Sequence, residues 1–212
     1  MRSYDEYCAI AKSLDVVGDR WTLLIVRELA LRGGCRYTDL RHGLPGIATN
    51  LLADRLRELE QAGVVAREDA PPPVATTLFH LTPRGEQLRP VLEDLVRWGL
   101  PLMTDQRPGE TVQSHWLAWA LELNLSDDHP DQPAVEVELR TGDQPITIEA
   151  TNGTVRARMT PSNDPKLILS GDAKPILGLV FGLRDLEAAQ AAGVTYEGDP
   201  GVLDRIRGTF TP

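Results

Sequence analysis

A run of polar side chains between residues 49 and 57 could make contacts with the edges of DNA bases. Leu52, Leu56 and Leu59 recur at helical spacing, so the side chains between them point away from the core. Asparagine can pair with adenine, arginine with guanine or phosphate, and a carboxylate with cytosine. An ordinary solvated helix face with local ion pairs is the alternative interpretation. The side chains that we predict to contact DNA are Thr49, Asn50, Asp54, Arg55 and Arg57.

The residues around this helix predict the elements that would position it. A short helix over 37–40, a turn at Pro45-Gly46 and a helix from residue 48 or 49 to Gly63 give the order of a helix-turn-helix. Two strand-like runs follow at 64–68 and 77–81, joined by a loop with three consecutive prolines. Arginines at the edges of these elements would bind phosphate and position the duplex. They are Arg36, Arg41 and, as a weaker candidate, Arg67.

Three more helices are expected in the first half of the chain. One would begin near Tyr4 and end near Gly18, and a second, capped by Asp19, would span 20–31. The fifth helix would begin at Thr82-Pro83, because proline is tolerated in a first helical turn. Its apolar stripe is of the kind that pairs two subunits and consists of Leu88, Val91, Leu92, Leu95, Trp98 and Leu102.

The second half of the chain predicts a different architecture. A helix over 114–123 precedes three strands at 134–140, 146–150 and 155–159, with turns that include Asn152-Gly153. Further elements are expected at 167–169 (strand), 172–182 and 185–192 (helices), 194–197 (strand) and 199–208 (helix). The predicted fold class is therefore a mainly α winged helix-turn-helix domain over 1–104 and an α+β domain with an antiparallel sheet over 111–212. A linker would occupy 104–110.

The charge of the chain is divided unevenly between these two halves. The net charge of −9 comes from 13 basic and 14 acidic residues before residue 104, and 9 basic and 17 acidic residues after it. Between Arg20 and Arg67 there are 8 arginines and 5 acidic residues. DNA affinity depends on the cations that reach phosphate and not on whole-chain charge, so this distribution is compatible with DNA binding.

Other functional classes lack the residues that they need. There is no Gly-x-Ser-x-Gly motif, phosphate loop or dinucleotide fingerprint, and the four histidines have no metal-ligand spacing. The acidic stretch 126–131 is expected to be a solvated turn. We therefore expect no enzymatic activity, no cofactor and no metal site. The start of the chain lacks the form of a signal peptide, no apolar run is long enough to span a membrane, and we expect a cytoplasmic protein.

Two small sets of residues could respond to other molecules. The cysteines are Cys8, expected as a small apolar residue on the first helix, and Cys35, expected to be more accessible; either is a candidate for oxidation. Apolar side chains in the second half could line a ligand pocket or simply fill a closed core. These are Trp116, Trp119, Leu123, Leu177, Val180 and Phe181.

The first half resembles the HxlR-type winged-helix transcriptional regulators, relatives of the MarR class. The matching residues cover nearly all of 8–98 in order and spacing. They include Cys8, Gly18-Asp19-Arg20-Trp21, Arg36-Tyr37, Leu44-Pro45-Gly46-Ile47, Leu59-Glu60, Leu81-Thr82 and Trp98. The resemblance implies a homodimer in which the first and fifth helices pair the subunits and two recognition helices enter successive major grooves. The chain departs from the family at Ala53, where a hydroxyl residue is usual, and at the hairpin tip, which lacks basic residues.

The second half is similar to the sterol-carrier-protein type of lipid-binding domain. The similarity is carried by Pro165 to Ser170, Leu177-Gly178-Leu179, and the closing run from Val194 to Pro200, which contains Glu197-Gly198-Asp199-Pro200. It implies an α+β domain that can enclose an apolar molecule.

These observations predict a dimeric, sequence-specific DNA-binding regulator, expected to be a repressor, whose partners are double-stranded DNA and an apolar effector. Two alternatives remain. One is a small-molecule or lipid carrier in which the winged helix serves only dimerisation. The other is a regulator that senses oxidants through a thiol at Cys8 or Cys35. The operator, the regulated genes and the effector are not specified by the sequence.

Overall fold

The computed structural model describes residues 3–71, 76–104 and 109–208 and divides into two compact units, Met1–Leu95 and Val96–Pro212. The boundary falls inside helix α6 (Arg89–Gly99). Most of the expected linker, residues 105–108, and most of the expected proline-rich hairpin tip, residues 72–75, lie outside the described residues. Among the described helices, none has the length and apolar character needed to cross a membrane.

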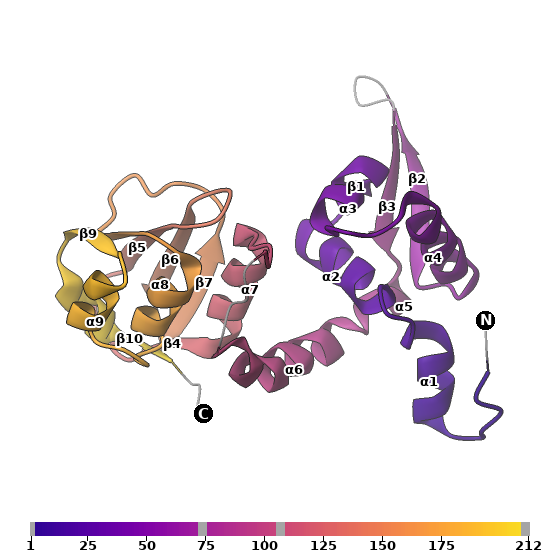
Figure 1. The fold of residues 1–212 in the computed structure, drawn as a ribbon, viewed down its shortest axis with the longest axis horizontal. Helices are drawn as coiled ribbons and strands as arrows, with labels where there is room; N and C mark the ends of the chain where they lie inside the picture. The colour runs from indigo at the N-terminus through magenta and orange to yellow at the C-terminus, as the bar shows by residue number, and fades with distance from the viewer. Residues whose placement is uncertain (1–2, 72–75, 105–108, 209–212) are drawn as a thin grey trace. The chain divides into compact units, whose positions relative to one another are not determined.

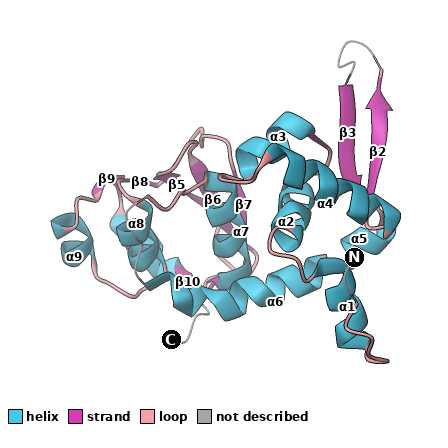
Figure 2. Ribbon diagram, turned by 45° about the vertical axis from the view of Figure 1, so that its right-hand side comes forward, coloured by secondary structure: helices cyan, strands magenta, loops and turns pink. Residues whose placement is uncertain are grey.

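The first unit has helices packed with a small three-stranded sheet (Figure 1). The sheet has the order β1-β3-β2 and is antiparallel throughout. The helix-turn-helix, α3 followed by α4, precedes the β2–β3 hairpin, which Figure 2 shows as two long strands side by side. The predicted winged helix-turn-helix is thus confirmed. Its elements are α1 (Ala9–Val17), α2 (Thr22–Arg32), β1 (Cys35–Arg36), α3 (Tyr37–Gly43), α4 (Thr49–Gln61), β2 (Val65–Ala70), β3 (Thr76–Leu81) and α5 (Pro83–Glu86), followed by α6.

Two of the predicted helix boundaries in this unit were wrong. α1 begins at Ala9 and not near Tyr4, because the preceding segment bonds elsewhere: the Tyr4 amide and the Ser3 hydroxyl both donate to the carboxylate of Asp15. The expected fifth helix is broken into α5 and α6. Pro90 has no N–H to donate to the carbonyl four residues earlier, so a continuous helix would lack a bond at this point. Strand β1, which pairs with β3, was not predicted.

A buried carboxylate joins α2 to α3 at the centre of the first unit. Glu28 has no exposed surface and forms ion pairs with Arg27 (2.8 Å) and Arg32 (3.2 Å). Arg27 also donates to the carbonyl of Gly43 at the end of α3. A Cβ atom at Gly43 would lie 2.1 Å from a Glu28 carboxylate oxygen, so glycine allows α3 to approach α2 closely. The ion pairs with Arg27 and Arg32 offset the free-energy cost of burying the Glu28 charge, and the hydrogen bond from Arg27 to Gly43 fixes the position of α3.

The second unit is a mixed seven-stranded sheet with helices, in the strand order β10-β4-β7-β6-β5-β8-β9. The expected strands at 134–140, 146–150, 155–159, 167–169 and 194–197 are present with small shifts in their ends. The elements are η1 (Leu100–Thr104), α7 (Ser114–Asn124), β4 (Leu125–Asp127), β5 (Val135–Arg140), β6 (Ile146–Thr151), β7 (Thr154–Arg158), β8 (Leu167–Ser170), α8 (Ala173–Val180), α9 (Leu186–Ala191), β9 (Thr195–Gly198), η2 (Pro200–Arg205) and β10 (Ile206–Gly208).

Three expectations for this unit were wrong. The sheet is not purely antiparallel. After β7 the chain passes to the far side of β5, where β8 pairs with β5 in parallel and Leu167 lies opposite Val137. The expected last helix is a short 3-10 helix followed by β10, because Ile206 is buried and pairs with Asp127 of β4. The stretch 126–131 is not simply a solvated turn, because its first two residues belong to β4.

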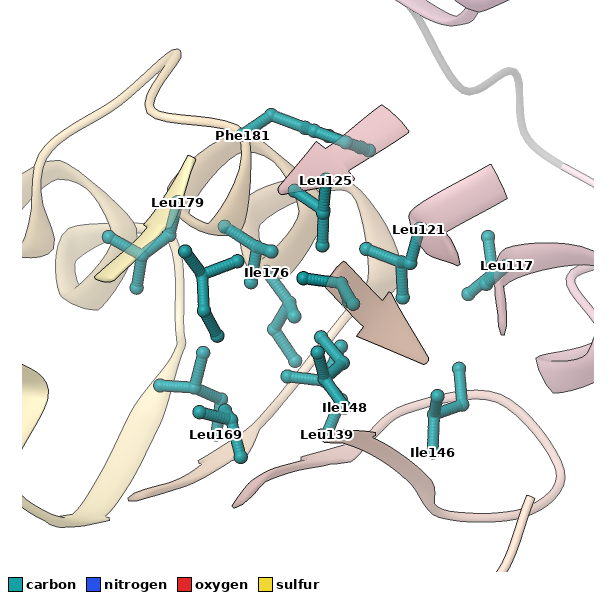
Figure 3. Close-up of a cluster of buried hydrophobic side chains, with 14 of the residues drawn as sticks. Leu117, Leu121, Leu125, Leu139, Ile146, Ile148, Leu169, Ile176, Leu179 and Phe181 are labelled. Atoms are coloured by element: carbon teal, nitrogen blue, oxygen red, sulfur yellow. The ribbon is translucent and has the colours of Figure 1, made fainter. Parts of the chain in front are cut away.

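The core of the second unit lies against one face of its sheet (Figure 3). Cross-strand neighbours on that face, such as Val137 and Ile148 or Leu139 and Ile146, have no exposed surface. Helix α7 packs on β6 and β7, and α8 contributes Ile176 and Leu179 to the same cluster. Period-2 alternation puts the charged residues of β5, such as Glu136 and Glu138, on the opposite face.

Candidate nucleic-acid interface

The start of the recognition helix α4 is held by the turn before it. Gly46, in the Pro45-Gly46 turn, has a φ of 88°, a conformation that glycine adopts without a steric penalty. The hydroxyl of Tyr37, at the start of α3, donates to the carbonyl of Thr49 over 2.6 Å. The carboxylate of Asp39 accepts from the Arg36 amide over 2.9 Å and so caps α3. The first turn of α4 is therefore tied directly to α3.

The outward face of α4 presents four of the five predicted base-contact residues. Leu52, Leu56 and Leu59 are buried as predicted. The side chains of Thr49, Asn50, Asp54 and Arg57 are exposed, whereas Arg55 is only partly exposed. The structure thus brings together one amide, one hydroxyl, one carboxylate and one guanidinium on one surface.

The arginines near this surface differ in how their charge is balanced. Arg57 pairs with Asp54 over 3.0 Å and Arg67 with Glu60 over 3.3 Å. Arg55 pairs with both Asp19 and Glu58. Arg36 and Arg41 are exposed, and within the described ranges no carboxylate lies at ion-pair distance from either side chain. Their guanidinium groups are the ones in this region that can meet phosphate without first breaking a pair.

Sequence reasoning missed three residues that hold the recognition helix. Asp19 was assigned only as a helix cap, yet its carboxylate bonds Arg55, and the residue at the N-cap position of α2 is Trp21. Glu58 entered only among the local ion pairs of the alternative interpretation, and the hydroxyl of Tyr37 was given no role. Tyr37 stood in a motif of the resembled family, which was a usable signal; the Asp19–Arg55 pair, 36 residues apart, left no local pattern.

Two helices of the winged-helix part carry apolar side chains that are exposed in the described part of the chain. On α1, Tyr7 just before the helix is fully exposed and Ile10 is 71% exposed, and only Ala11 is buried. On α6, Leu95 is 43% and Trp98 72% exposed. These are the faces that the sequence predicted for subunit pairing.

The two cysteines have the reverse of the environments expected. Cys8 is exposed and occupies the N-cap of α1, where hydrogen bonds from the backbone of Ala11 and Ile10 lower the pKa of its thiol. Cys35 is buried in β1, and burial raises the pKa of its thiol to about 11. The reason is that α1 begins one residue after Cys8, while β1 pairs with β3 at the edge of the sheet and the Cys35 thiol meets the Glu28 carbonyl of α2.

The structure brings only three of the six predicted pocket residues to the core cluster of the second unit. Val180 and Phe181 belong to the buried cluster, and Leu177 packs against it. Trp119 is buried, whereas Trp116 and Leu123 are half-buried. No group of three or more histidine, cysteine, aspartate or glutamate side chains that could hold a metal ion occurs in the part of the chain that the structure describes.

The α3–α4 pair with its β-hairpin and outward polar face defines a winged helix-turn-helix protein. Residues 16–107 match the model of the family described as HxlR-like helix-turn-helix. The chain is 36% identical over 87 residues to the uncharacterized HTH-type transcriptional regulator YvaP of Bacillus subtilis, covering 41% of this chain and 80% of that protein. This chain belongs to the HxlR-like helix-turn-helix family, whose relatives here are named transcriptional regulators, and the predicted class is confirmed.

Further similarities concern the same part of the chain. The HTH-type transcriptional regulator YodB of Bacillus subtilis is 32% identical over 102 residues, which cover 47% of this chain and 86% of YodB. Among solved structures, a putative transcriptional regulator of the MarR family from Porphyromonas gingivalis W83 is 30% identical. That match covers 47% of this chain and 97% of the other, with a TM-score of 0.42.

Proposed function

We propose that this chain is a sequence-specific DNA-binding repressor whose helix α4 enters the major groove. The observation that carries the proposal is the exposed polar face of α4, in which Asn50, Asp54 and Arg57 are held outward by a buried leucine row. Arg36 and Arg41 would bind phosphate beside it, and residues 1–104 would act as the DNA-binding and dimerisation domain. Arg67 would add a weaker contact from the hairpin.

We further propose that the working form is a homodimer paired through α1 and α6. The uncovered apolar faces of the two helices support this, because contiguous exposed apolar surface marks interaction sites. A two-fold dimer would place its two α4 helices in half-sites about 34–36 Å apart on one side of the duplex.

The DNA proposal is tested by selecting sequences from a random or genomic pool and titrating the best one. Asn50→Ala should weaken binding to that sequence by about 1–3 kcal/mol and relax the preference at one base position in each half-site. Gln61→Ala, an exposed change at the far end of the same helix, should leave affinity and preference unchanged. If the wild-type protein selects no sequence over bulk DNA, the proposal fails.

For residues 111–212 we propose a sterol-carrier-like domain that binds an apolar molecule and thereby shifts the affinity for the operator. The apolar cluster between sheet and helices supports this proposal, with Val180 and Phe181 in it and Leu177 packed against it. Trp116, Trp119 and Leu123 would complete the binding site from α7. Calorimetry with a fatty acid and with a sterol tests it. Binding that leaves operator affinity unchanged would favour a carrier, and the absence of binding by either probe would mean a closed core.

A second candidate function, thiol sensing, is favoured by the environment of Cys8. Its exposed position and lowered pKa favour the reactive thiolate at the N-terminus of α1. Iodoacetamide, which a thiolate attacks with loss of iodide, should label the native protein at Cys8 and not at Cys35. Cys8→Ser should then abolish any release from DNA by oxidants, and Cys35→Ser should not. Release that survives Cys8→Ser would exclude this candidate.

A further inference from the structure

Arg55 differs from the other arginines of the DNA-facing region in its surroundings. Its Nη1 atom donates to a carboxylate oxygen of Asp19 and to one of Glu58. The Arg55 side chain is 21% exposed, compared with 64% for Arg57 in the same helix. Asp19 lies 36 residues earlier, in the turn between α1 and α2. The bonds from Arg55 therefore join the recognition helix to a distant part of the chain.

The charges around Arg55 make it a poor ligand for DNA phosphate. One guanidinium is shared by two carboxylates, so the group as a whole carries excess negative charge. To reach phosphate, Arg55 would either give up both pairs or bring Asp19 and Glu58 toward another anion. Either course costs electrostatic energy that the exposed Arg36 and Arg41 do not incur.

The turn that holds Asp19 is itself closely fixed. The Gly18 amide donates to the carbonyl of Leu14 over 2.8 Å, and a Cβ atom at Gly18 would lie 2.5 Å from that same oxygen. The carbonyl of Asp19 accepts from the Thr22 amide over 3.0 Å at the start of α2. The Gly18 amide and the Asp19 carbonyl thus hold this turn between α1 and α2, and the Asp19 carboxylate reaches α4 from it.

Directional bonds add to the orientation that apolar packing gives a helix. The buried row Leu52, Leu56 and Leu59 sets the distance of α4 from the core, but dispersion contacts have little angular preference. Recognition side chains need to be held within about 0.5 Å and 10–20° of their working position. The Tyr37–Thr49 hydrogen bond holds the start of α4, and the Asp19–Arg55 pair holds its middle.

We propose that Arg55 is a positioning residue that locks the rotation of α4 through Asp19 and Glu58 and does not itself contact DNA. The proposal rests on the proposed function of α4 as the recognition helix. It reassigns a residue that the sequence pattern alone places among the DNA contacts. The geometry leaves Arg57, on the exposed face, as the arginine of α4 that meets the duplex.

The first test uses the free protein, without DNA. Amide hydrogen exchange along α4 should become about tenfold faster in Asp19→Asn and in Arg55→Met, because each removes the tie to the α1–α2 turn. Arg57→Met is the matched control: it removes an arginine of the same helix whose pair with Asp54 is local and exposed, and it should leave exchange unchanged. Unchanged α4 exchange in both Asp19→Asn and Arg55→Met would overturn the proposal.

The second test measures the salt dependence of DNA binding by the full chain. Arg55→Met should weaken binding several-fold without changing the slope of log K against log salt. Arg41→Met should lower that slope by about 0.9 for each arginine withdrawn from phosphate. The double variant Asp19→Asn/Arg55→Met should cost no more than Arg55→Met alone, because both changes break one connection.

The outcomes separate this proposal from the proposed function. A slope that falls in Arg55→Met as it does in Arg41→Met would show a phosphate contact and overturn the positioning role. If the wild-type protein binds no DNA but α4 exchange rises as expected, the proposed function fails while the Asp19–Arg55 connection stands.

Discussion

In the first unit, α1 and α6 leave Ile10, Val91 and Leu95 open to solvent, whereas in the second unit the leucines and isoleucines of the sheet are sealed under α7 and α8. Both units bury a hydrophobic core, but apolar side chains on α1 and on the first part of α6 remain exposed at helical spacing. A helix face that stays apolar and uncovered is stabilised by a second molecule. The contrast supports the proposal that α1 and α6 pair two copies of the chain.

The two units also bury charge in a similar way. Glu28 is paired with Arg27 and Arg32, and Asp127 in the second unit is paired with Arg205, which donates to both oxygens of the carboxylate. The pairing partners satisfy the buried charges. The Glu28 pairs lie within α2, and Arg27 reaches α3 through the Gly43 carbonyl, whereas the Asp127–Arg205 pair joins two elements directly. In the second unit that connection joins the last 3-10 helix to β4.

The largest expected effect comes from placing a charge on the uncovered face of α1. Ile10→Asp should convert the dimer to monomer, since a carboxylate would be desolvated at the contact. Loss of the second half-site should lower operator affinity by at least about 100-fold. Analytical ultracentrifugation and DNA titration measure the two quantities. Lys12→Ala, at an exposed residue on the other side of the same helix, should change neither, and a dimeric Ile10→Asp protein would contradict the assignment of this face.

A cavity in the core of the second unit should have the next largest effect. Ile176→Ala removes a side chain with no exposed surface and should lower the free energy of unfolding of that unit by about 2–5 kcal/mol. Leu183→Ala, at a side chain 56% exposed, should cost less than about 0.5 kcal/mol. Chemical denaturation followed separately in each unit provides the measurement. If Ile176→Ala lowered the free energy of unfolding of both units equally, the contrast between the two units would be wrong.

The smallest effect should appear as a dependence on acid pH in the second unit alone. Hydrogen bonds from Arg205 lower the pKa of Asp127 from 3.8 to about 2. A carboxyl whose pKa is lower in the folded state stabilises above its ordinary pKa, by about 2–3 kcal/mol, and this contribution is lost as the pH falls from about 4 to about 2.

The measurement is the free energy of unfolding between pH 5 and pH 2, compared with that of Asp127→Asn. The variant is less stable at neutral pH, because the Arg205 charge is left without its partner, and it should lose the Asp127 part of the acid dependence. An unaltered pH profile in Asp127→Asn would show that this pair does not control acid stability.

Local patterns were sufficient to predict most elements of the chain. The spacing of Leu52, Leu56 and Leu59 placed α4 and its outward face correctly, and the Pro45-Gly46 turn placed its start. In the second half, alternation and the Asn152-Gly153 turn placed β5, β6 and β7 within one residue or two. These signals are strong because a helix or hairpin buries one of its faces, so that apolar residues recur along the sequence with the period of that element.

The elements and environments that were not predicted correctly depend on contacts between distant parts of the chain. β1, β4 and β10 are strands of two or three residues, too short to carry a period, and they exist only because a partner strand offers hydrogen bonds. The parallel pairing of β8 with β5 depends on the path of the chain and not on the composition of either strand. The environments of Cys8 and Cys35 were reversed for a related reason: a helix that begins at Ala9 and not near Tyr4, and one unpredicted strand, decided which thiol was covered.

The sequence by itself determined the helix-turn-helix, the hairpin and the outward polar face of α4, because each follows from the spacing of residues that are neighbours along the chain. Only the tertiary structure decided which of those polar side chains are available. Arg55 and Arg57 are two residues apart and of one type, yet Arg55 is held by Asp19 from another turn and Arg57 is exposed. Ion pairing depends on distance in space, and folding brings together charges that the order of residues keeps apart.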